Sequence, residues 1–86
     1  MKSLIKNYID LLSVEKLNEF GLKNNIHLNN NELEYLLNLI QNNWEDILKD
    51  ETKYLEELQK NVNPDDFIKI KNLVIYYKNR YKGYLF

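Results

Sequence analysis

The chain has 86 residues, of which 44% are hydrophobic and 13% aromatic, and its formal net charge is −1. This length accommodates one small core, and the hydrophobic fraction excludes an intrinsically disordered chain. The sequence contains no cysteine, which excludes disulfides, a thiolate nucleophile and a cysteine-based zinc site. We therefore expect one domain, spanning residues 1–86, without a metal or another cofactor.

The sequence also bears on cellular location and on nucleic-acid binding. No apolar run approaches the roughly 20 residues that cross a bilayer, and Lys6 and Asp10 lie where a signal peptide would be apolar. We therefore expect a cytoplasmic protein without membrane contact. Fourteen asparagines, eleven lysines and no alanine indicate an AT-rich genome. The abundance of lysine is thus not by itself a sign of nucleic-acid binding.

Two helices are predicted in the first 25 residues. The first, over 3–12, has helically spaced apolar residues, namely Leu4, Ile5, Tyr8, Ile9 and Leu12. The second, over 14–25, has Ser13 as its N-cap and is weakened by Gly21.

Two further helices are expected in the middle of the chain. After an extended link at 26–28, Asn29 and Glu32 have capping-box spacing at the start of a helix over 30–42. That helix is apolar on more than one face, so we expect it at the centre of the bundle. The stretch NNWEDIL is interpreted as a second link, and Asp50 as the cap of an outer helix over 51–61.

The fifth helix has the clearest start signal, because Pro64 occupies its first position after an Asn63 cap and two acidic residues follow. We expect it to run to residue 82 and to stop at Gly83. At 100° per residue, Tyr77 and Tyr81 fall on its apolar stripe and face the interior. Its cations lie on both shoulders of that stripe, which is not the pattern of a nucleic-acid interface.

Charge and apolar residues suggest where a partner would bind. Residues 1–66 carry seven lysines and thirteen acids, whereas residues 67–86 carry five cations and no acid. A second apolar line on the fifth helix either packs on another helix of the chain or meets another chain, and Tyr76 lies off the stripe. The candidate partner-binding residues are Ile68, Ile75, Tyr76, Arg80 and Phe86.

Catalytic and metal-binding patterns are missing from the sequence. His27 is the one histidine, so the chain holds neither a histidine pair for a metal nor a cysteine–histidine nucleophile. We interpret His27 as a residue of a connecting link. The acidic residues lie at helix starts and on solvated faces, and the links lack the ligand spacing of a calcium loop. We therefore predict that the protein is not an enzyme.

The order of the elements, from LSVEKLNEFGLKNNIHL through LLNLIQNNWEDIL to NPDDFIKIKNLVIYYKNRY, resembles a family of small uncharacterised cytosolic proteins from low-GC Gram-positive bacteria. The resemblance covers residues 12–82 and implies an all-α domain of unknown function. It brings no active site with it.

These observations predict an all-α orthogonal bundle of four to five helices with short links. The function we expect is non-enzymatic protein–protein interaction, as a homodimer or as an accessory or regulatory subunit of unknown pathway. The alternative is nucleic-acid binding through the basic, tyrosine-containing fifth helix.

Overall fold

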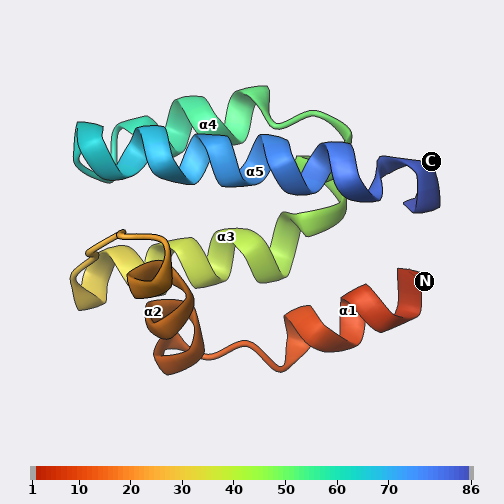
Figure 1. Ribbon diagram of the computed structural model, residues 1–86, viewed down its shortest axis with the longest axis horizontal. Helices are drawn as coiled ribbons and strands as arrows, with labels where there is room; N and C mark the ends of the chain where they lie inside the picture. Colours follow the sequence, from red (N-terminus) through yellow and green to blue (C-terminus); the bar gives the residue numbers. More distant parts are fainter. Residues whose placement is uncertain (1, 86) are drawn as a thin grey trace.

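The computed structural model describes residues 2–85, which form five α-helices (Figure 1). In chain order they are α1 (Lys2–Asp10), α2 (Val14–Lys23), α3 (Asn30–Lys49), α4 (Thr52–Gln59) and α5 (Pro64–Leu85). Figure 1 shows α3, α4 and α5 running along the long axis of the molecule, with α2 across it. The start of α1 and the end of α5 lie at the same end of the bundle. The expected small all-α bundle is confirmed.

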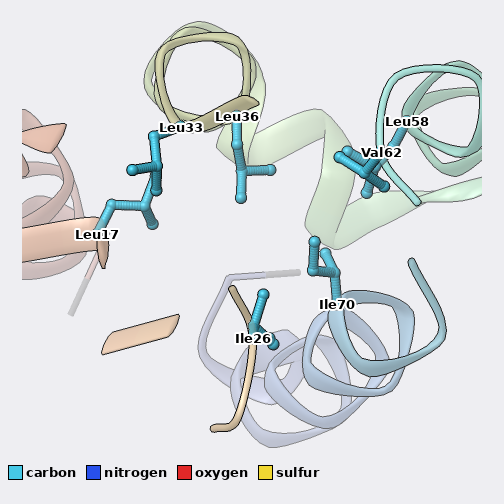
Figure 2. Packing of buried hydrophobic residues seen from close by; sticks show 7 residues of the cluster. All are labelled: Leu17, Ile26, Leu33, Leu36, Leu58, Val62 and Ile70. Atoms are coloured by element: carbon cyan, nitrogen blue, oxygen red, sulfur yellow. The ribbon is translucent and has the colours of Figure 1, made fainter. Parts of the chain in front are cut away.

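The core forms between α2, α3, α4 and α5. Its buried aliphatic side chains point toward one another in Figure 2; they are Leu17, Ile26, Leu33, Leu36, Leu58, Val62 and Ile70. As predicted, α3 is central, because it packs against each of the other four helices. The short helix α4 supplies the most deeply buried of these side chains, Leu58, which is 1% exposed.

The predicted link after residue 42 is wrong, since α3 continues without a break to Lys49. Neither glycine nor proline interrupts this stretch, and half-buried Trp44, Ile47 and Leu48 continue the helical spacing of the preceding apolar residues. Asn43 adapts to the helix by donating from its side chain to the carbonyl oxygen of Leu39 at 3.1 Å. The 20-residue helix is therefore long enough to contact both ends of the bundle.

A left-handed residue ends α2 and turns the chain into the core. Asn25 has a φ of 60°, and the Ile26 amide donates to the carbonyl oxygen of Gly21 at 2.8 Å. The Asn25 amide donates to the Leu22 carbonyl oxygen at 3.1 Å, which completes a Schellman motif. A Cβ atom on Gly21 would lie 3.3 Å from the Ile26 carbonyl oxygen, so glycine at this position lets the chain after α2 pass this close to the helix.

The link that follows α2 is attached to the start of α5 by polar contacts. Asp66 is 5% exposed, and its carboxylate accepts from the His27 amide at 3.4 Å and from the Asn63 side chain. Lys69 donates to the Asn25 carbonyl oxygen at 2.8 Å. His27 has an exposed side chain that contacts Asn25 Oδ1 at 3.2 Å, as expected for a residue of a connecting link.

An ion pair joins α5 to the start of α4. Asp50 accepts a hydrogen bond from the Thr52 amide at 3.0 Å, but the N-cap of α4 is Glu51, so the predicted cap at Asp50 is one residue early. Lys78 Nζ lies 2.7 Å from Glu51 Oε2, and both side chains are largely buried. The hydrogen bond from Lys78 lowers the pKa of Glu51. Further along, α5 continues through Gly83 to Leu85, so the predicted stop at Gly83 is wrong.

We predict that Asn25→Ala lowers the free energy of unfolding by about 1 kcal/mol, because alanine lacks the short polar side chain with which asparagine tolerates the left-handed region. Asn25→Gly should match or exceed the wild-type stability. Both variants lose the side-chain contact with His27, so their difference isolates the backbone effect. Urea denaturation followed by circular dichroism measures this difference. Equal stabilities of the two variants would contradict the left-handed conformation of residue 25.

Replacing Lys78 tests the ion pair and its pH dependence. A carboxylate with a lowered pKa stabilises the fold above its ordinary pKa, and that stabilisation is lost as the pH falls through the lowered value. Lys78→Gln should therefore cost about 1 kcal/mol at pH 7, and the difference from wild type should shrink below about pH 4. Exposed Lys71→Gln is the control and should change stability little at either pH. If the stability lost in Lys78→Gln stayed constant with pH, the ion pair with Glu51 would not be its cause.

Candidate functional site

The helix α1 lies outside the core and leaves an apolar face uncovered. It contains no buried residue. Ile5, Ile9 and Leu12 are half-buried, and α1 packs on α3. The adjacent apolar line consists of Leu4, Tyr8 and Leu11, which are 68%, 64% and 69% exposed. We call these three residues the outer line of α1; their i, i+4, i+7 spacing places them on one face of the helix.

Polar contacts hold α1 in place and pair its charges. Gln41 of α3 donates from its side-chain amide to the carbonyl oxygens of Ile9, at 3.1 Å, and Leu12, at 3.2 Å. These bonds tie the end of α1 and the turn that follows it to α3. Lys2 forms an ion pair with Glu45 at 3.0 Å, and Lys6 pairs with Asp10 at 2.6 Å. The charged side chains of α1 are thus all paired, whereas its outer line is uncovered.

A group of aromatic rings lies on the second half of α5, around Tyr77. The Tyr77 ring is 6.2 Å from that of Phe20 on α2 and 5.2 Å from that of Tyr76, in an edge-on arrangement. Tyr81 stacks on Tyr77 at 6.1 Å with an interplanar angle of 5°. Tyr77 and Tyr81 are half-buried, so the expected inward direction of this stripe holds in part. Tyr76 is 55% exposed, as predicted.

Burial and neighbouring phenols act on Tyr77, the central tyrosine of this group. Burial is the main cause that raises the pKa of Tyr77, and the neighbouring phenols of Tyr81, Tyr76 and Tyr8 raise it further. We call the outer line of α1 and the exposed aromatic side chains of α5, taken together, the aromatic surface. It consists of Leu4, Tyr8, Leu11, Tyr76 and Tyr81 together with Arg80.

Arg80 is the cation of this surface. Its guanidinium carbon lies 5.8 Å from the centre of the Tyr81 ring, within cation–π range. A hydrogen bond with Tyr81 is the main cause that raises the pKa of Arg80, and the phenol of Tyr76 contributes as well. The exposed guanidinium is thus positioned by two tyrosines.

The predicted partner-binding residues do not form a single cluster. Tyr76 and Arg80 come together at the aromatic surface. Ile68 is 57% exposed, so the second apolar line is not buried against another helix there, and Ile75 is half-buried. Ile68 precedes Tyr76 by about 12 Å along the helix axis, and Ile75 is turned from Tyr76 by about 100°. Phe86 lies outside the described residues.

The outer line of α1 was missed as a site. Its signal is present in the sequence, because six of the nine residues from 4 to 12 are apolar. These residues cover more of the helix circumference than a small outer helix needs to pack on one neighbour. The pattern does not indicate which of them α3 covers.

Other kinds of site find little support in residues 2–85. No group of three or more His, Asp or Glu side chains in that range is placed to hold a metal ion. None of the helices described is both long and apolar enough to cross a membrane. Of the α5 cations, Lys69 contacts a backbone carbonyl, Lys78 pairs with Glu51, and Arg80 lies on Tyr81. These three cations are thus engaged with groups of the chain itself.

Comparisons with known proteins returned no matching family model, no matching curated protein and no matching solved structure. The resemblance to small proteins of low-GC Gram-positive bacteria stays a prediction.

The two apolar lines of α1 should differ in their effect on stability. Leu4→Asn changes an exposed side chain and should alter the free energy of unfolding by less than about 0.5 kcal/mol. Ile5→Asn introduces the same residue one position along, on the half-buried line, and should cost at least about 1 kcal/mol. Thermal or urea unfolding distinguishes them. Equal losses would show that the outer line is packed rather than free.

Proposed function

We propose that this protein is a non-enzymatic protein–protein interaction module that binds its partner through the aromatic surface. The observation that carries this proposal is the exposure of the outer line of α1, where three large apolar side chains in one row are each more than 60% exposed. Contiguous exposed apolar side chains of this kind commonly mark interaction sites. An i, i+4, i+7 row is also the pattern by which one helix docks on another protein.

The composition of the aromatic surface supports the same proposal. Tyrosine and arginine are enriched at protein interfaces, and they account for much of the binding energy that alanine substitutions reveal. Stacking restrains Tyr77 and Tyr81, and Arg80 lies over the Tyr81 ring. Side chains already held in place lose little conformational entropy when a partner binds. A homodimer is one form of such an interaction.

A capture experiment with matched variants tests the proposal. The tagged wild-type chain should retain a specific protein from a lysate, and the double variant Leu4→Asn, Leu11→Asn should lose it. Ile68→Asn is the matched control, since Ile68 is an exposed aliphatic residue outside the aromatic surface. It should retain the same protein. Circular dichroism must show the same helicity in all three chains.

Sedimentation over a range of concentrations provides the second readout. A dimer that dissociates with the double variant but not with Ile68→Asn would identify the partner as another copy of the chain. The proposed surface would be wrong if Ile68→Asn abolished capture or dimerisation while the double variant did not. It would also be wrong if the wild-type chain stayed monomeric and captured only proteins that the double variant captures as well.

A further inference from the structure

The outer line of α1 is a continuous row on one helix face. Leu11 lies one residue beyond α1, and its amide donates to the Asn7 carbonyl oxygen at 3.2 Å, so the helical turn continues through it. The row extends over about 10 Å of the helix axis. The half-buried side of α1 is turned from the row by about 100°. Figure 1 shows α1 at the periphery of the bundle, beside α3, so a partner can reach the row.

No charged side chain of α1 borders the outer line. The charged residues of Lys2–Asp10 are Lys2, Lys6 and Asp10, and each of them is paired. They are turned from the row by about 130° to 170° around the helix. Lipid surfaces and nucleic acids attract proteins through available cations, and charged peptides bind through opposite charges. Since the row offers no such charge, its complement is another neutral, apolar row.

The outer line is complementary to itself when two copies of α1 run antiparallel. Leu4, Tyr8 and Leu11 read leucine–tyrosine–leucine from either end. A twofold axis close to Tyr8 therefore places Leu4 of one copy opposite Leu11 of the other, with the two Tyr8 rings side by side. Dimers with one twofold axis are the commonest protein oligomers. The net charge of −1 gives little repulsion between two copies.

We propose that the partner of the outer line is a second copy of this chain, bound through an antiparallel pair of α1 helices. This inference rests on the proposed function and names the partner. The three side chains expose on the order of 350 Å² per copy, about half of the roughly 800 Å² per partner that a stable complex buries. The dimer is therefore weak and exchanges with the monomer, with a Kd of about 10 µM to 1 mM.

Dilution of the full chain tests the dimer. Amide NMR spectra are recorded from about 10 µM to 1 mM, and sedimentation is measured over the same range. The amide shifts of residues 2–12 should change with concentration and give the same Kd as sedimentation. The double variant Leu4→Asn, Leu11→Asn should raise that Kd at least about tenfold. Ile68→Asn, which changes an exposed aliphatic residue on α5, should leave it unchanged.

Cross-linking tests the antiparallel order, because the chain has no cysteine of its own. A mixture of Leu4→Cys and isotope-labelled Leu11→Cys should form a mixed disulfide dimer several-fold faster than either variant alone, as measured by mass spectrometry. The two substituted positions face each other in the proposed pair. Like positions lie about 10 Å apart along the helix axis, beyond the roughly 7 Å that a disulfide bridges between Cα atoms. A mixture of Leu4→Cys with Ile68→Cys is the control and should show no such preference.

Several outcomes would overturn the inference. Amide shifts that stay constant up to about 1 mM would show a monomer. Concentration-dependent shifts that persist in the double variant would place the contact elsewhere, and disulfides of Leu4→Cys with itself that form as fast as mixed ones would exclude the antiparallel order. Phosphatidylserine vesicles that broaden the α1 amides of a monomeric chain would replace the second copy by a lipid surface. If the chain is monomeric but still captures a protein through its outer line, this inference fails while the proposed function stands.

Discussion

Packing of α3 against the other four helices is the interaction on which the rest of the structure depends. Leu33 and Leu36 of α3 contribute to the core that α2, α4 and α5 complete. In a chain of 86 residues, one small core must offset the conformational entropy lost on folding. Because the same helix also carries the Gln41 side chain that holds the end of α1, it fixes the position of the outer line of α1.

Much of the fold could be predicted from local chemistry. The Asn29–Glu32 capping box and the Ser13 cap form as their spacing indicates. The link expected after residue 42 does not form, because paired asparagines lower helix propensity only slightly and the partial burial of Trp44 favours continuing the helix. Gly83 likewise fails to end α5, since glycine permits a helix stop without enforcing one.

The candidate site could be predicted only in part. Tyr76 departs from the apolar stripe of α5, and this departure correctly indicates an exposed side chain. Periodicity identifies α1 as amphipathic but not which of its apolar residues α3 covers. That choice depends on the Gln41 and Glu45 contacts, which join residues about 30 or more positions apart in the chain. Such contacts leave no periodic trace in the sequence.

The absence of buried residues from α1 has an evolutionary consequence. Most substitutions in a core reduce stability, and a small domain tolerates few of them before it unfolds. Exposed positions such as Leu4 and Leu11 escape that constraint. New side chains can be sampled there while the four-helix core stays intact. The exposed face of α1 and the core that folds the chain thus lie in different parts of one short chain, and each can diverge between descendants at its own pace.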